Sequence, residues 1–241
     1  MKVLAQAKFE TLTILRHGEQ AVLNIVLPLV ALVILARVPL PTADEPLGPS
    51  LAYGSALALA WASTAFTAQA IAVAFDRRWG VLRMLSTTPL GPSGLFGGKL
   101  LAVGLVGLIE TVLLGITALI LGADVNLAVL LPGLGLGLTG LAAFLALGLL
   151  LGGSLRPEAV LAIGNLAWAL MAGFGGILIP LSAFPTWWAT IACYTPPGAL
   201  GQGMRALAGG EGSPLVSIVI LLGWAIAGSV LTVRFFRWDS K

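Results

Sequence analysis

Phosphate binding is the first chemistry to consider, because Gly98-Lys99 has the order that ends a phosphate-binding loop. Ser93 stands where the first glycine of that loop must fall. Leu100 stands where a Ser or Thr would bind magnesium. We therefore predict that this chain has no nucleotide site and carries no cofactor of its own.

Dinucleotide, metal and nucleophilic chemistry are not supported either. Gly135-x-Gly137-x-x-Gly140 matches a dinucleotide fingerprint, but it lies inside an apolar run rather than after a strand, so helix packing explains it. His17 is the only histidine and Cys193 the only cysteine, so neither a disulfide nor a metal site is expected. We predict that the chain is not an enzyme.

One acidic residue, Glu110, lies near the middle of an apolar run over residues 100–122. If this run crosses a membrane, the carboxyl should face the interior of a helix bundle, be protonated or be paired. It would either contact a substrate or a proton on a pathway, or be a neutral group hydrogen-bonded to Ser or Thr. The other polar candidates at this depth, each with interhelical hydrogen bonding as its alternative role, are Asn24, Gln69, Asn165 and Trp168.

The composition indicates the environment of these residues. The 241 residues are 58% hydrophobic and 10% charged, whereas soluble domains are roughly 45–50% apolar and 25% charged. Runs that approach the length of about 20 residues needed to cross a bilayer lie at 20–36, 51–75, 100–122, 127–152, 159–181 and 214–233. We predict an all-α integral membrane protein, with six transmembrane helices in a single domain over residues 1–241.

The basic residues are distributed unevenly between the two sides that these runs define. Eleven of the 13 fall on one side, and only Arg37 and Arg205 fall on the other. Because Lys and Arg are retained in the cytoplasm, we predict that both termini are cytoplasmic. The net charge of +3 then reflects orientation and does not indicate nucleic-acid binding. Residues 1–19 lack the apolar core and cleavage site of a signal peptide, so the first run should be a mature helix.

Residues 1–19 also show helical periodicity. Val3, Leu4, Ala7, Ile14 and Leu15 share one side, and Lys2, Gln6, Glu10, Thr13 and Arg16 lie mostly on the other. This pattern predicts an amphipathic helix in the cytoplasmic interface, with Phe9 on the wrong face.

Two connections between the apolar runs are too elaborate for linkers. The first, residues 76–90 on the cytoplasmic side, has the pattern of a short amphipathic helix that ends at Pro89, because the residue before a proline avoids helical angles. A partner protein could bind such a helix. From the residues alone, a basic anchor at the membrane surface is equally possible.

The second connection, residues 182–213, is apolar but interrupted by prolines and glycines, so it cannot cross the membrane as one helix. We predict a re-entrant pair of short helices on the extracellular side, covered by protein. The residues that define this hairpin are Pro185, Trp187, Trp188, Pro196 and Arg205. The two tryptophans are expected at the outer interface.

The residue order in both connections resembles one family. Asp76-Arg77-Arg78-x-Gly80-x-Leu82-x-x-Leu85-x-x-Thr88-Pro89-Leu90, followed by Gly98-Lys99, is similar to the segment after the second span of type-2 ABC exporter permeases. Residues 182–213 are similar to the proline-and-tryptophan hairpin between spans five and six of that family. Asp76, Val81 and Arg83 depart from its usual Glu, Thr and acidic residue.

The resemblance implies a half-size permease in a bacterial plasma membrane. It would pair with itself or a sister subunit and recruit two ABC ATPase subunits, which would bind ATP and Mg. The helix after the second span would couple to the ATPase through Asp76, Arg77, Arg78, Gly80, Leu82, Leu85, Thr88 and Pro89. The dimer would export a hydrophobic or amphipathic compound of the drug, lipid or glycolipid class by alternating access.

Two other functions stay open. One is an ion-gradient-driven transporter that uses Glu110, although the paired repeats typical of such transporters are not visible. The other is a membrane scaffold without transport, or an assembly subunit of the haem-export type. The apolar runs carry too few polar groups to indicate a substrate.

Overall fold

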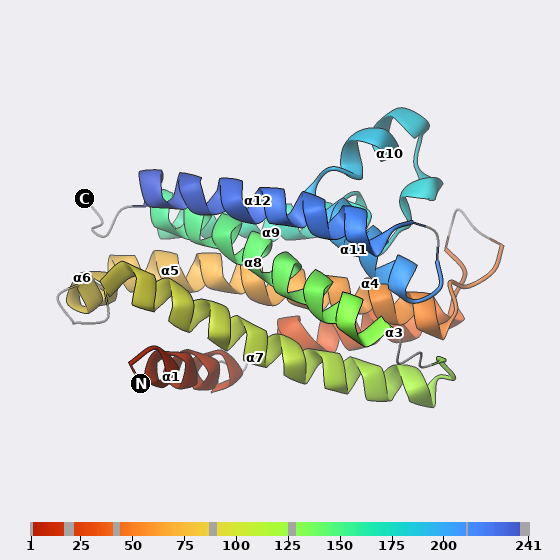
Figure 1. Cartoon of the computed structure of the whole chain (residues 1–241), viewed down its shortest axis with the longest axis horizontal. Coiled ribbons are helices and arrows are strands. Elements are labelled where there is room, and N and C mark those ends of the chain that lie inside the picture. Colours follow the sequence, from red (N-terminus) through yellow and green to blue (C-terminus); the bar gives the residue numbers. More distant parts are fainter. Residues whose placement is uncertain are drawn as a thin grey trace.

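The computed structural model of the chain describes residues 2–16, 22–40, 44–86, 91–124, 129–210 and 212–236. Every regular element in these ranges is a helix, which confirms the predicted all-α class. The long helices lie side by side (Figure 1). At one end of the bundle, the α6 end, are α6 (Val81–Ser86), α1 (Lys2–Arg16) and the last turn of α12 (Pro214–Phe235); α10 (Thr186–Ala192) marks the opposite, α10 end (Figure 1).

Four helical segments of the described chain are long and apolar enough to cross a bilayer. They are Pro49–Arg78, Gly94–Ile120, Leu131–Ser154 and Pro214–Phe235. Two further apolar helices, Asn24–Arg37 and Pro157–Gly173, fall in the shorter class of 10–17 residues. The predicted count of six spans therefore stays a prediction.

The first half of the chain contains two π-helical turns, η1 (Val22–Val26) and η2 (Ser63–Ala68). The turn η1 leads into α3 (Leu27–Arg37). The next segment is continuous, with η2 between α4 (Pro49–Ala62) and α5 (Gln69–Arg78). After α6 comes α7 (Gly91–Ile120).

The second half begins with α8 (Leu130–Ser154) and α9 (Pro157–Gly173). The 3-10 turn η4 (Leu181–Ala183), α10, α11 (Pro196–Leu207) and α12 follow. Proline stands in the first turn of α4, α9, α11 and α12, where its missing N–H would have had no helical partner. These prolines help to set where the helices begin.

Small residues allow the central helices to approach closely. A Cβ on Gly152 of α8 would lie 2.3 Å from the Ala70 carbonyl oxygen, and one on Gly54 of α4 would lie 2.8 Å from the Met204 carbonyl oxygen. Close packing of this kind holds helices together in a membrane. Lipid is as apolar as the side chains, so the hydrophobic effect does not drive the helices together there. The core therefore lies where α8 and α11 pack against the segment α4–η2–α5.

The glycines that match a dinucleotide fingerprint lie inside α8, as expected. A Cβ on Gly137 would lie 2.7 Å from the Trp61 ring, and one on Gly140 would lie 2.9 Å from a Leu200 methyl. These positions serve helix packing, which confirms that interpretation.

The helix α1 packs along α7. Ala7 and Ile14 of its predicted apolar side are buried, and the correction concerns Glu10, which was predicted on the polar side and is buried too. Phe9 is exposed. A Cβ on Gly98 of α7 would lie 2.6 Å from Cγ of Gln6, so the two backbones are close. The side of α1 that carries Gln6 and Glu10 faces the protein, because Glu10 has a charged partner there.

Candidate functional site

The π-helical segment η2 lies opposite Glu110. The Glu110 carboxyl is 1% exposed, and the Thr64 hydroxyl donates a hydrogen bond to its Oε1. Within the described part of the chain, Oε2 has no hydrogen-bond partner. Glu110 therefore faces the interior of the bundle.

A tryptophan fixes α4 against α7 one turn away. The indole Nε1 of Trp61 donates to the Gly107 carbonyl oxygen at 3.2 Å. The ring fits because position 107 has no side chain: a Cβ there would lie 3.3 Å from that nitrogen. Trp61 precedes Thr64 by three residues, and Gly107 precedes Glu110 by three, so the indole contact holds both elements of the Glu110 site in place.

A second tryptophan connects α9 to η2. The Trp168 indole Nε1 donates to the Ser63 hydroxyl at 2.6 Å, and that hydroxyl donates to the Leu59 carbonyl oxygen at 2.8 Å. Two predicted pathway residues, Glu110 and Trp168, thus contact neighbouring residues of one π-helical segment.

The third predicted pathway residue is not part of this cluster. Asn165 is exposed on α9. Ser63 and Thr64, which the sequence analysis did not single out, provide the contacts instead. The only feature that could have indicated Ser63 and Thr64 is that two hydroxyl residues stand together in an Ala-rich run. A π-helical turn has no sequence signature, so the sequence could not show that they face Trp168 and Glu110.

A buried ion pair joins α1, α5 and α7 on the side of η2 toward the α6 end. Lys99 is 1% exposed, and its Nζ lies 2.9 Å from Oε1 of Glu10. The same Nζ donates to Oε1 of Gln69 at 3.3 Å. Gln6 donates to Glu10 at 3.0 Å. The sequence analysis considered Lys99 in a phosphate loop and in the family motif, but nothing in the sequence places Glu10 beside it.

The turn between α5 and α6 determines how α6 projects. Gly80 has φ of 73°, a left-handed conformation that favours glycine, and a Cβ there would have open space around it. Arg77 is buried and donates to the carbonyl oxygens of Gly153 and Leu155 at the C-terminus of α8. A guanidinium in this position donates hydrogen bonds to the terminal carbonyls, and its positive charge interacts favourably with the negative end of the helix dipole.

The predicted ATPase-coupling residues divide into buried and exposed groups. Leu82 is fully buried, and Asp76 and Leu85 are half-buried. Arg78 is exposed and forms an ion pair with Glu158 of α9. Thr88 and Pro89 lie outside the described residues. The exposed side chains at this end also include Trp79, Arg83 and Met84.

The α10 end is held by a buried arginine. Arg205 of α11 donates to the carbonyl oxygens of Gly176 and Ile177 at 2.7 and 2.8 Å. It also donates to the Ser55 hydroxyl of α4 at 3.1 Å. Arg205 therefore joins α4, α11 and the segment that follows α9.

The other predicted hairpin residues lie around α10 and the start of α11. Pro185 immediately precedes α10, and Pro196 is the first residue of α11. Trp187 is exposed, while the Trp188 indole donates to the Phe174 carbonyl oxygen at 3.0 Å. Most of α11 is buried between α4, α8 and α12. Two short helices, α10 and α11, occupy this segment, and the predicted re-entrant hairpin stays a prediction.

The chain was also compared with known proteins. The model of the family described as "ABC-2 family transporter protein" matches residues 27–235, which include every helix except α1 and η1. This family is the one that the residue order at 76–90 resembles. None of the curated proteins compared with the chain matches it.

Proposed function

We propose that this chain, which belongs to the ABC-2 family of transporter proteins, is the permease subunit of an ATP-driven exporter in a bacterial plasma membrane. The family and the apolar helices make it a multi-pass membrane transport component. The observation that carries the finer proposal is the α6 end. Trp79, in the turn before α6, and Met84 of α6 are exposed, and buried Arg77 and Leu82 fix this end to the bundle.

The arrangement of the ends supports the proposed topology. Helix α1, α6 and the last turn of α12 lie at the same end of the bundle (Figure 1). Both termini would then be cytoplasmic, as the basic residues favour. In this topology α3 and α9, although short, are the remaining two of six spans.

Coupling would use the two groups of α6-end residues differently. Arg78, Trp79, Arg83 and Met84 are exposed and would contact two ABC ATPase subunits that bind ATP and Mg. Arg77 binds the end of α8, so movement of α6 would pass into the bundle. In this account Arg77 and Leu82 position the contact surface and do not form it.

A second permease protomer, identical or related, is supported by Asn165. Its amide is exposed on α9 among apolar side chains, and a polar group facing lipid is costly. The same side of the helix carries Ala162 and Ala169, small residues of the kind that allow close helix packing. Pairing of the two amides across a two-fold axis would satisfy both.

The cargo pathway would then follow the outer face of α9 between the protomers, past Asn165. Glu110 and Trp168 form hydrogen bonds inside one protomer, which supports a structural role for both. Because the exposed faces are mainly apolar, the proposed cargo is hydrophobic or amphipathic and moves outward by alternating access.

The test is purification of the chain from its native membrane in mild detergent, followed by identification of co-purified proteins and an ATPase assay. Recovery of an ABC ATPase with activity is expected. Met84→Glu should abolish that recovery, because it places a charge in the proposed contact. Tyr194→Glu is the control: Tyr194 is at the α10 end, and both side chains are 64% exposed. Full ATPase recovery with Met84→Glu would contradict the proposal.

The gradient-driven alternative has one observation in its favour, the buried Glu110 beside an irregular turn in the middle of a long helix. It predicts transport by the reconstituted chain alone under a pH gradient, abolished by Glu110→Gln. The exporter predicts no transport until an ATPase and ATP are added.

A further inference from the structure

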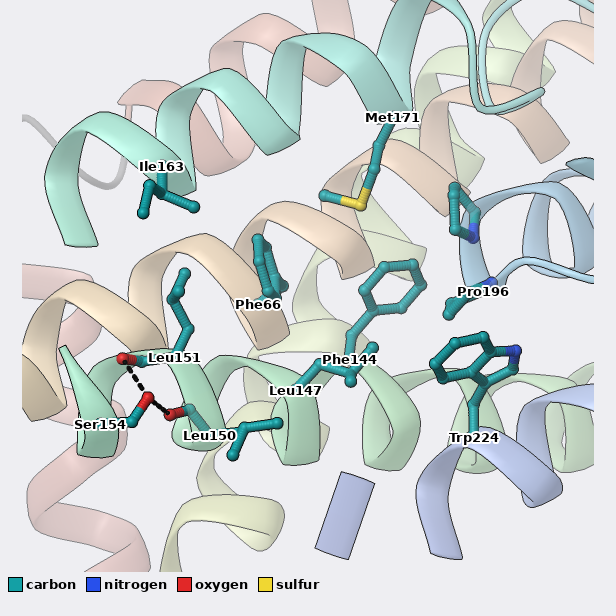
Figure 2. Close-up of a pocket in the computed structure, with 11 residues that line it drawn as sticks. Phe66, Phe144, Leu147, Leu150, Leu151, Ser154, Ile163, Met171, Pro196 and Trp224 are labelled. Carbon is teal, nitrogen blue, oxygen red and sulfur yellow. Dashed lines mark hydrogen bonds between the residues drawn. The ribbon is translucent and has the colours of Figure 1, made fainter. Parts of the chain in front are cut away.

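An apolar groove opens between α8 and α9 (Figure 2). Its volume is about 360 Å³, within the range of ligand-binding clefts. Phe66 of η2 lies between the two helices, and Pro196 and Trp224 lie at one end (Figure 2). Ser154 lies at the other end, which is the α6 end of the bundle.

The polar side chains that line the groove already have partners. The Ser154 hydroxyl donates to the Leu150 carbonyl oxygen at 2.5 Å (Figure 2). The Trp224 indole donates to the Tyr194 carbonyl oxygen at 2.9 Å. The remaining lining side chains are hydrocarbon, proline rings or a methionine. Nothing in the lining requires a polar ligand, so the occupant is an apolar chain.

The length of the groove matches one leaflet of a bilayer. It extends along α9 from Ile163 to Met171 and along α8 from Phe144 to Ser154. At a rise of 1.5 Å per residue these stretches are about 12 and 15 Å long. The hydrocarbon core of a bilayer is about 30 Å thick, so one leaflet contributes about 15 Å.

Positive charge surrounds the Ser154 end. Arg156 is exposed in the short connection that joins α8 to α9. The exposed ion pair of Arg78 and Glu158 lies beside it, and the buried Arg77 binds the same connection. Three arginines against one carboxylate leave a net positive charge, which favours an anionic headgroup. This end is cytoplasmic in the proposed topology. The choice of the cytoplasmic leaflet therefore rests on the proposed function.

We propose that the α8–α9 groove binds one acyl chain of an anionic phospholipid of the cytoplasmic leaflet, with its phosphate at Arg156. The other candidate to cover this groove is a second protomer. Asn165, which supports the protomer contact, is two residues from Ile163, so the two side chains point about 200° apart around α9. The groove therefore stays open to lipid when α9 pairs through Asn165.

The test uses the full chain in phosphatidylglycerol proteoliposomes, with a trace of phosphatidylglycerol that carries a photoactivatable diazirine on one acyl chain. Labelled peptides are expected to concentrate in residues 144–171. Ile163→Trp fills part of the groove and should lower labelling about tenfold. This is the loss of affinity expected when about two methylenes of the acyl chain are no longer buried. Leu166→Trp is the control, because Leu166 is exposed on the same helix outside the lining, and labelling should persist.

A second arm tests the headgroup. Phosphatidylcholine with the same diazirine chain should label the groove more weakly than phosphatidylglycerol, and Arg156→Glu should remove that difference. Labelling spread evenly over the exposed helix faces would overturn the proposal. So would a disulfide-linked dimer of the Ile163→Cys variant in membranes, made with Cys193→Ser to remove the native thiol, because it would show that a second copy covers the groove. No ATPase is present, so a failure here is distinct from a failure of the exporter proposal.

Discussion

Both ends of the bundle contain a buried arginine that binds main-chain carbonyl oxygens, and the surroundings of the two arginines differ. At the α6 end, Arg77 binds Gly153 and Leu155 at the C-terminus of α8. At the α10 end, Arg205 binds Gly176, Ile177 and a hydroxyl of α4. Each guanidinium satisfies acceptors that burial would otherwise leave unpaired.

The difference lies in what each arginine leaves accessible. Arg77 fixes the base of α6 while Trp79 and Met84, beyond it, stay exposed. Arg205 ties together elements that are themselves buried, including most of α11. Arg77 therefore fixes the base of an exposed surface, whereas Arg205 fixes the packing of buried helices. Changes at the first should reduce coupling, and changes at the second should reduce stability.

The largest effect is expected at the ion pair that holds α1 near the α6 end. Lys99→Met leaves Glu10 buried without its partner, so it should lower the free energy of unfolding by about 3–5 kcal/mol. For a chain of this size that is a fall in Tm of about 10 °C or more. Glu10→Leu combined with Lys99→Met should recover most of the loss in a detergent thermal melt. A double variant as unstable as the single one would show that the charge pair is not the cause.

Removing the arginine at the α10 end comes next. Arg205→Met leaves two carbonyls and a hydroxyl without their donor. We expect a loss of about 3 kcal/mol, which takes the low end of roughly 1–3 kcal/mol for each of the three groups. The matched variant is Arg37→Met, which removes an exposed arginine whose contact is one long hydrogen bond to Leu121. It should change stability by less than about 0.5 kcal/mol. Equal melting curves for the two variants would contradict the packing role of Arg205.

Alanine variants of two glycines can distinguish an effect of backbone strain from a loss of coupling to the ATPase. Gly80 and Gly48 have φ of 73° and 78°, and neither has an atom within 4 Å of an added Cβ. Alanine should cost about 1–2 kcal/mol of backbone strain at Gly80. At Gly48, where ψ is 160°, it should cost about 1–3 kcal/mol, because that region is essentially restricted to glycine. Only Gly80→Ala should also reduce transport-coupled ATPase activity, because it redirects α6. The activities of both reconstituted variants measure this, and an equal loss in the two would remove the special role of α6.

The smallest effect is expected at Glu110. Gln keeps the shape of the side chain and an oxygen that can accept from Thr64, so Glu110→Gln should change stability by less than about 1 kcal/mol. Transport should not change between acidic and neutral pH. Loss of transport with normal folding would instead support a proton or substrate role for this carboxyl.

The sequence predicted the elements that follow from composition and local order. Hydrophobic runs indicated the helices, and the prolines and glycines of residues 182–213 indicated that this segment is not one long helix. It did not predict contacts between elements far apart in the chain. Glu10 and Lys99 are 89 residues apart, and periodicity in residues 1–19 says nothing about which neighbour that helix meets.

The candidate sites were predicted unevenly for the same reason. The order of residues at 76–90 carried the family. It predicted one short helix there, whereas residues 76–78 end α5 and α6 is only Val81–Ser86, after the turn at Gly80. It did not separate Arg77 and Leu82, which are buried, from Trp79, which is exposed, because burial depends on where α8 ends. Glu110 was recognised by its depth, but its partner Thr64 depends on a π-helical turn.

The most direct test is photo-crosslinking from the exposed face of the α6 end in the native membrane. A photoreactive amino acid replaces Trp79 in one variant and Trp187 at the α10 end in the other; these side chains are 70% and 66% exposed. We expect a crosslink to an ABC ATPase from position 79 and none from position 187. No ATPase crosslink from position 79, in membranes where the chain is folded and the ATPase is present, would contradict the assignment of the α6 end as the docking surface.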